Sequence, residues 1–220
     1  MDVSEESFEQ RHARVLAHLV PAVCHRLNNT VAVTSGMVEL ALLGSSPESR
    51  TENLELALEQ SKLTVGQLKR LGSLAGLSES ALAAEDAVRA LEDAAGLLGA
   101  VFQVSGGRFE SRVPETAVPV ATDRRRLTQL LVLLACSPFA ASEEEASIGQ
   151  GASARRLRLR LEPRVEGAAL YLTYRCATDE VAAETNELMR APCAELHAEL
   201  STRSFGGSTC HRLILPGLRS

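Results

Sequence analysis

The sequence predicts an α+β fold in which a long helical hairpin precedes a layer of helices packed on a mixed sheet. The first third of the chain has apolar residues at helical spacing in two long stretches, which are separated by a Gly44 to Pro47 turn. The remainder alternates short strand-like runs with shorter helical patterns. Aromatic residues make up only 3% of the chain, while alanine and leucine are frequent, and this composition favours helix packing.

The two long helices are predicted at residues 7–43 and 47–74. Each would be about 40 to 55 Å long at a rise of about 1.5 Å per residue. A hairpin of this length cannot bury its own apolar surface, so we expect two copies to dimerise into a four-helix bundle with two-fold symmetry. Pro21 removes one backbone hydrogen bond, which predicts a bend one turn before His25.

The second part of the chain is predicted to be an α/β sandwich that follows a short linker at residues 76–80. The predicted domains are therefore 1–76 and 81–220. An acidic segment with Gly and Ser at 142–153 predicts a loop. The patterns predict a helix at 81–100, strands at 101–104 and 117–121, a helix at 123–140, strands at 155–162 and 168–176 joined by a turn at 163–167, a helix at 181–202 and a strand at 209–215.

Composition excludes several classes of protein. The 220 residues are 45% hydrophobic and 23% charged, which is typical of a globular chain. A net charge of −5 argues against nucleic-acid binding, and the arginine runs at 124–126 and 155–160 are typical of a helix start and of the exposed side of a strand. The five cysteines lack CxxC spacing, which indicates a reduced protein without disulfides or zinc. With an acidic N-terminus and no apolar run of about 20 residues, we expect a cytoplasmic protein that does not enter a membrane.

The most informative motif is His25-Arg26-Leu27-Asn28-Asn29 in the first predicted helix. Residues four apart share one helix face, so His25 and Asn29 project together. The opposite side is predicted to be buried, which leaves the imidazole facing solvent and suits a histidine that accepts a phosphoryl group. That side, about 140 to 200° round the helix from His25, carries Leu16, Val20, Val23 and Leu27.

With this motif in a hairpin that precedes an α/β unit, the chain resembles bacterial sensor histidine kinases over nearly its full length. The hairpin resembles their dimerisation and phosphoacceptor domain, and the rest resembles their ATP-binding domain. The resemblance implies that His25 is the phosphoacceptor and that Asn29 helps to place a water or the phosphoryl group. Arg26 departs from the pattern, because such kinases carry Asp or Glu there as a general base and arginine cannot accept a proton.

The second half departs further from that family. The predicted helix at 123–140 resembles the helix that carries a magnesium-binding asparagine, but residues 133–138 read Leu-Leu-Ala-Cys-Ser-Pro. The strand ending at 176 should lead into Asp-x-Gly-x-Gly, but residues 175–180 read Arg-Cys-Ala-Thr-Asp-Glu. About eight residues would separate this strand from the next helix, which is too few for the lid that covers ATP. The resemblance therefore implies a retained scaffold with a degenerate nucleotide site.

From these features we expect a histidine phosphotransferase, which moves a phosphoryl group between receiver-domain aspartates through His25 without ATP and without a cofactor, the magnesium being held by the receiver. Small neighbours of His25 would let a receiver approach closely, and Arg26 would pair with phosphoryl oxygens. The residues expected to contact the receiver are His18, Ala22, Arg26 and Ala32. Three alternatives remain: a non-catalytic pseudokinase scaffold or anti-kinase that binds response regulators or kinases, an active kinase with an unusual nucleotide site, and, for Asn29, a purely polar surface position.

Overall fold

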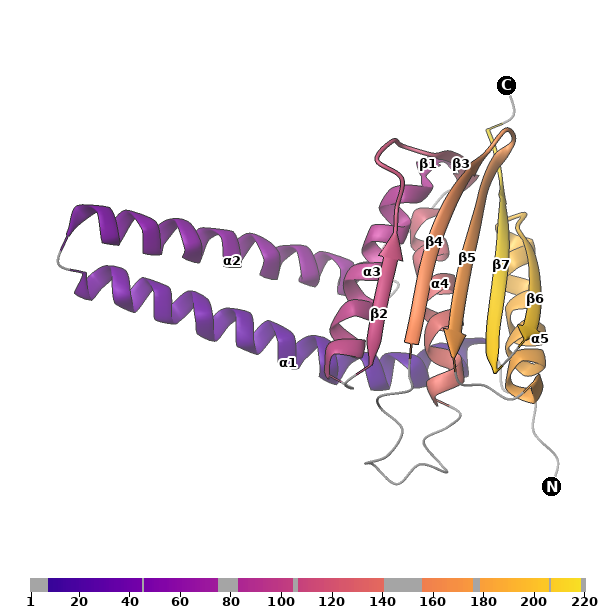
Figure 1. Ribbon diagram of the computed structural model, residues 1–220, viewed down its shortest axis with the longest axis horizontal. Helices are drawn as coiled ribbons and strands as arrows, with labels where there is room; N and C mark the ends of the chain where they lie inside the picture. The colour runs from indigo at the N-terminus through magenta and orange to yellow at the C-terminus, as the bar shows by residue number, and fades with distance from the viewer. Residues whose placement is uncertain are drawn as a thin grey trace.

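The structure, a computed structural model, describes residues 8–44, 46–74, 83–104, 107–140, 156–175, 179–205 and 207–218. Helices α1 (Phe8–Leu43) and α2 (Pro47–Leu74) form an antiparallel hairpin that projects from an α/β unit (Figure 1). Both helices confirm the predicted bounds to within one residue, and α1 continues through Pro21 as helix. Ser46 caps α2, because its hydroxyl accepts a hydrogen bond from the backbone N–H of Ser49 at 3.2 Å. Among the described helices, none is long and apolar enough to cross a membrane.

The α/β unit contains a mixed five-stranded sheet with helices on one face (Figure 1). β2 runs parallel to β4, whereas the other neighbouring strands are antiparallel. A separate antiparallel pair joins β1 (Ala83–Asp86) to β3 (Pro119–Thr122). In spatial order the five strands are β2 (Arg108–Arg112), β4 (Arg156–Arg164), β5 (Gly167–Arg175), β7 (Ser208–Pro216) and β6 (Glu199–Phe205). The covering helices are α3 (Ala87–Val104), α4 (Arg124–Ala140) and α5 (Asp179–Glu195). The predicted α+β arrangement is confirmed.

The structure corrects the predicted elements between the hairpin and α4. Residues 83–86 form a strand and not the start of a helix, because Asp86 caps α3: its Oδ1 accepts hydrogen bonds from the backbone N–H groups of Val88 (3.0 Å) and Val118 (2.9 Å). Residues 101–104 are the last turn of α3 and not a strand. The strand β2, which follows at Arg108–Arg112, was not predicted. The predicted linker at 76–80, with the domain boundary it marks, and the predicted loop at 142–153 lie outside the described residues.

The helix predicted at 181–202 is also too long, because α5 ends at Glu195 and Glu199–Phe205 is a strand. The helix ends in a Schellman motif centred on His197, whose φ is 51°. The backbone N–H of Ala198 donates to Cys193 O at 2.8 Å, and that of His197 donates to Ala194 O at 3.0 Å. Glycine usually occupies this left-handed position, so a histidine there gives no sequence signal for the end of the helix.

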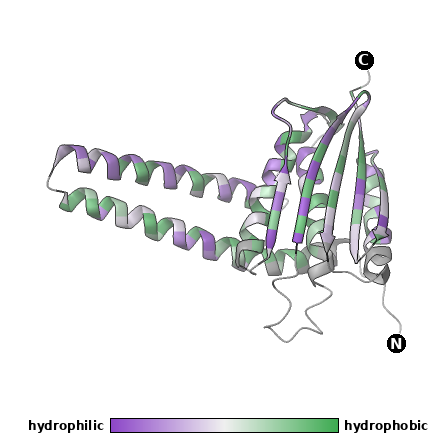
Figure 2. Cartoon of the chain, in the orientation of Figure 1, coloured by the Kyte–Doolittle hydropathy of each residue, from purple (hydrophilic) through white to green (hydrophobic). Residues whose placement is uncertain are grey.

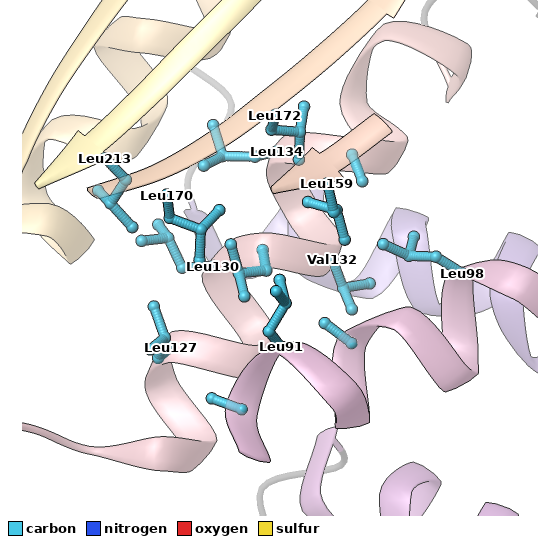
Figure 3. Packing of buried hydrophobic residues seen from close by; sticks show 14 of the residues in the cluster. Leu91, Leu98, Leu127, Leu130, Val132, Leu134, Leu159, Leu170, Leu172 and Leu213 are labelled. Carbon is cyan, nitrogen blue, oxygen red and sulfur yellow. The ribbon is translucent and has the colours of Figure 1, made fainter. Parts of the chain in front are cut away.

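The core lies between the sheet and the helices. Leu91 of α3 and Leu130 and Leu134 of α4 face leucines of the sheet such as Leu159 and Leu170 (Figure 3). Hydrophobic and hydrophilic bands alternate along β4 (Figure 2), so that one side of the strand joins this core.

The first half of α1 belongs to the same core. Val15, Leu19 and Val23 are each 1% exposed and pack with residues of α3 and α4. The base of α2 is tied to the same helices: Gln129 of α4 donates a hydrogen bond from Nε2 to Leu74 O at 3.0 Å. The distal halves of α1 and α2 therefore project from a base that is built into the α/β unit.

Candidate functional site

His25 lies on α1 just beyond the point where this helix leaves the core. Val23 is buried, whereas the side chain of His25 is exposed. Leu16 and Leu27 are partly buried against the core. Val20 departs from the predicted buried side, because 37% of its surface is exposed. The turns of α1 that precede His25 are fixed by packing, and the helix holds the imidazole outward.

His25 and Asn29 interact directly on the exposed face of α1. The Asn29 Nδ2 lies 3.3 Å from His25 Nε2. An amide NH₂ group only donates hydrogen bonds, so in this arrangement Nε2 accepts and the ring proton resides on Nδ1. The geometry is compatible with the tautomer that has its lone pair on Nε2, which is the nucleophilic form of histidine.

A hollow of about 480 Å³ opens beside this pair, at the junction of the hairpin and the α/β unit. Arg26 is half-buried in its wall, and its backbone oxygen accepts a hydrogen bond from the Thr30 hydroxyl at 2.9 Å. Three helices supply the lining: α1 contributes His25, Arg26, Asn29, Thr30 and Val33, α2 contributes Gln60, and α3 contributes Ala100. None of these described residues carries a carboxylate, so the hollow offers an imidazole, a guanidinium group and amides but no acidic side chain.

The structure brings three of the predicted site residues together, namely His25, Arg26 and Asn29. Ala22 is only 8% exposed, because the core packing of α1 extends to this position, and its predicted contact with a receiver stays a prediction. Ala32 is exposed on α1 outside the lining of the hollow. His18 lies in α1, and its side chain is outside the described part of the structure.

Sequence analysis missed four lining residues. Thr30 and Val33 lie one helical turn beyond Arg26 and Asn29, so the periodicity of α1 contained a signal for them. Gln60 and Ala100 come from other helices, and only the tertiary packing of α2 and α3 places them beside His25.

The residues that were predicted to depart from a nucleotide site lie on α4 and between β5 and α5. Leu133 and Leu134 of α4 are 0% and 1% exposed and belong to the core. β5 ends at Arg175 and α5 begins at Asp179, so the connection is shorter than the predicted eight residues. Within the described residues, no group of three or more His, Cys, Asp or Glu side chains is arranged to hold a metal ion.

The fold is similar to that of histidine kinases. Histidine kinase ThkA, solved in complex with response regulator protein TrrA, matches with a TM-score of 0.50 at 13% identity, covering 99% of this chain and 68% of that chain. The catalytic domain of ThkA gives a TM-score of 0.46 at 13% identity over 62% of this chain and 95% of that chain. Acinetobacter baumannii histidine kinase AdeS gives 0.44 at 14% identity over 87% and 97%.

No family model matches the sequence, and no curated protein is similar enough to count as a relative. At these identities the structural likeness shows the fold alone. The chain therefore has a histidine-kinase-like fold, in which a helical hairpin leads into an α/β unit.

Proposed function

We propose that this protein is a histidine phosphotransferase of a two-component phosphorelay. The observation that carries the proposal is the exposed His25, whose Nε2 lies beside Asn29 at an open hollow on a histidine-kinase-like hairpin. The ThkA structure was solved with a response regulator, which supports receiver domains as the partners of this chain as well.

In the proposed reaction, the Nε2 lone pair of His25 attacks the phosphorus of a receiver's phosphoaspartate. An N–P bond forms, the P–O bond to the aspartate breaks, and the carboxylate leaves with the bonding electrons. Transfer to a second receiver reverses these steps with another carboxylate as nucleophile. The catalytic contribution is positioning and charge neutralisation, because no bond in this exchange requires a proton from the protein.

Asn29 and Arg26 have distinct roles in this scheme. The amide of Asn29 holds the reactive tautomer before attack and turns to a phosphoryl oxygen as the N–P bond forms. The guanidinium of Arg26 neutralises charge on the phosphoryl group or contacts an acidic side chain of the receiver. Magnesium is supplied by the receiver, and the chain needs no cofactor of its own.

The proposal excludes ATP-dependent autophosphorylation for three reasons. Arg26 stands where a kinase of this kind has a carboxylate base. Leu133 and Leu134 occupy core positions on the helix that would offer a magnesium ligand. The connection after β5 is too short for an ATP lid. A protein that exchanges phosphoryl groups with receivers is expected in the cytoplasm, in keeping with its scattered cysteines.

We further propose that two copies pair through the hairpin into a four-helix bundle. Ala41 and Ala57, each 5% exposed, mark where α1 and α2 face one another. Each helix carries one stripe of exposed apolar residues. Around the helix axis, each stripe lies about 20 to 100° from the buried alanine, in the same sense on both helices. In antiparallel helices equal rotations lead to the same side, so the stripes form one apolar face. We call it the hairpin seam: Val31, Val38, Leu42, Leu54, Leu58, Val65 and Leu68.

The hollow beside His25 lies away from the hairpin seam. Around their helix axes, Asn29 of α1 and Gln60 of α2 lie about 60 to 120° from the buried alanines, in the opposite sense to the residues of the hairpin seam. A dimer formed along the seam therefore leaves both copies of His25 open to a receiver.

A second candidate function is a non-catalytic scaffold that binds receivers or kinases. The specific observation in its favour is that no described residue lining the hollow is a carboxylate, since a docking surface needs no base.

The test uses a purified receiver that has been phosphorylated with radiolabelled acetyl phosphate. For a phosphotransferase, label appears on the protein in an acid-labile, base-stable form, and His25→Gln loses it completely. The matched control is His197→Gln, an exposed histidine in the α/β unit, which keeps the label. If the parent protein and the His25→Gln variant both bind the receiver but neither acquires label, the result supports the scaffold. Labelling by magnesium–ATP alone contradicts both candidates.

A further inference from the structure

The helices leave one face of the five-stranded sheet uncovered (Figure 1). The strand register shows that this face is rich in arginine. Leu157, Leu159 and Leu161 of β4 are buried toward the helices, so the alternate residues of this strand point to the other side. The strand register extends this side across the sheet. We call it the arginine face, and its arginines with described side chains are Arg108 and Arg112 (β2), Arg156, Arg158, Arg160 and Arg164 (β4), Arg203 (β6) and Arg212 (β7).

The arginine face has the opposite sign to the rest of the chain. Its acidic residues are fewer, namely Glu110, Glu162 and Glu199. The chain as a whole carries a net charge of −5, so the net charge of the residues outside this face is more negative than −5. A concentration of one sign against an opposite background is the electrostatic pattern of a steering and docking surface.

The carboxylates on the face leave several arginines unneutralised. Glu110 pairs with both Arg156 and Arg158, whose side chains remain 43% and 54% exposed. Glu162 pairs with Arg160. Within the part of the chain that the structure describes, no ion pair involves Arg108, Arg112 or Arg203, and all three are exposed.

The face already shows how it binds a carboxylate. The two oxygens of Glu110 accept hydrogen bonds from different arginines, one from Arg156 and one from Arg158 Nε at 2.8 Å. These hydrogen bonds hold the pKa of Glu110 below its usual value. Arg156 and Arg158 are alternate residues of β4, so their side chains lie on the same side of the strand and hold one carboxylate between them.

Arg212 adds a further donor at the centre of the face. Its guanidinium lies 5.9 Å from the centre of the Tyr171 ring, which it covers. Its Nε is buried and has no hydrogen-bond partner within the described residues. The contact with the Tyr171 ring orients the Arg212 side chain along the arginine face.

We propose that the arginine face is a docking surface for an acidic protein, one that presents rows of Asp and Glu side chains. The internal pairs of Glu110 show that its guanidinium groups are spaced for carboxylates. Nucleic acids and anionic membranes are extended polyanions, and the acidic remainder of this chain would repel them on either side of the face. This proposal is separate from phosphotransfer at His25, which lies on α1.

The test compares two triple variants that have the same net charge of −8, since each removes three positive charges from −5. The face variant carries Arg108→Gln, Arg112→Gln and Arg203→Gln. The matched control removes exposed arginines of the helices: Arg89→Gln, Arg126→Gln and Arg190→Gln. Binding of a fluorescein-labelled oligoglutamate peptide is measured by anisotropy at about 0.05 and about 0.2 M salt, with circular dichroism to check folding.

We expect the parent protein and the control variant to bind the peptide, with affinity that falls as salt rises. The face variant should bind at least about tenfold more weakly. Equal binding by the face variant and the parent overturns the proposal, as does an equal loss in the control. Tighter, face-dependent binding of a DNA duplex or of phosphatidylserine vesicles overturns the choice of an acidic protein. His25→Gln should bind the peptide normally, which separates this result from a failure of the proposed phosphotransfer.

Discussion

His211 is a buried histidine whose two ring nitrogens are both hydrogen-bonded. Its Nε2 lies 2.8 Å from the Tyr174 hydroxyl, and its Nδ1 lies 2.6 Å from the hydroxyl of Thr202, which itself donates to Asn186 Oδ1. Burial raises the pKa of Tyr174, so this side chain stays an O–H donor to Nε2. The neutral imidazole with its proton on Nδ1 satisfies the whole network, which ties β5, β6, β7 and α5 together.

The first prediction concerns the pH dependence that this network imposes. Burial lowers the pKa of His211 to about 4, from about 6.5 in the unfolded chain. Between these values the unfolded state binds the extra proton, so the free energy of unfolding rises with pH and is lost as pH falls from about 6.5 toward 4. We expect a loss of about 2 kcal/mol at His211 between about pH 7.5 and about pH 5.

Urea unfolding at these two pH values measures the effect. His211→Gln lowers the free energy of unfolding at both pH values. The difference in this free energy between the two pH values becomes smaller by most of the expected loss of about 2 kcal/mol. His25→Gln, at an exposed histidine, keeps the parent's dependence. If His211→Gln leaves the pH dependence unchanged, the buried neutral imidazole is not its source.

The sequence alone predicted part of the candidate site. The i, i+4 spacing placed His25 and Asn29 on one exposed helix face, and their contact at 3.3 Å follows from that spacing. The same periodicity did not reveal that Ala22 is nearly buried, because the neighbouring helices α3 and α4 cover part of α1 and burial depends on them. Gln60 reaches the hollow from another helix, which no local pattern encodes.

Among the elements, long helices were predictable and short strands were not. α1, α2 and α4 carry many turns of apolar periodicity, so their bounds were recovered closely. β1 has only four residues, Ala83–Asp86, and exists because it pairs with β3, which comes after α3 and β2 in the chain. β2 alternates weakly and is held by a parallel partner, β4, far along the sequence. Such strands depend on tertiary pairing more than on their own residues.

The second prediction concerns the backbone at the end of α5. His197 has a φ of 51°, a left-handed conformation that costs an L-residue about 1 to 2 kcal/mol and costs glycine almost nothing. His197→Gly should therefore raise the free energy of unfolding by about 1 kcal/mol in urea titrations. His197→Ala is the matched control, because it removes the same side chain and retains the strained backbone. A gain of equal size in the alanine variant would show that the imidazole, and not the backbone, limits stability.

The whole molecule combines a shared core with an exposed arm. Leu19 and Val23 of α1 are buried with Leu91 and Leu130 of the α/β unit, so the base of the hairpin is fixed in that unit. Farther along the hairpin, large apolar side chains such as Leu42 and Leu58 are 77% and 57% exposed. Exposed apolar surface of this extent on a helical hairpin is typical of an interface.

Assembly through the hairpin seam gives the last prediction. Leu58→Lys with Val65→Lys places two charges on the seam of each copy, where like charges face one another in a dimer. The matched control is Leu56→Lys with Leu63→Lys, which has the same spacing on the same helix but lies on the opposite side. Like-charge contacts at an interface cost several kcal/mol, so the seam variant should weaken dimerisation at least about a hundredfold, measured by sedimentation equilibrium. The control should remain a dimer. A monomeric parent, or equal dissociation of both variants, would contradict pairing along this seam, whereas loss of phosphotransfer in the control alone would locate receiver contacts on the side that carries His25.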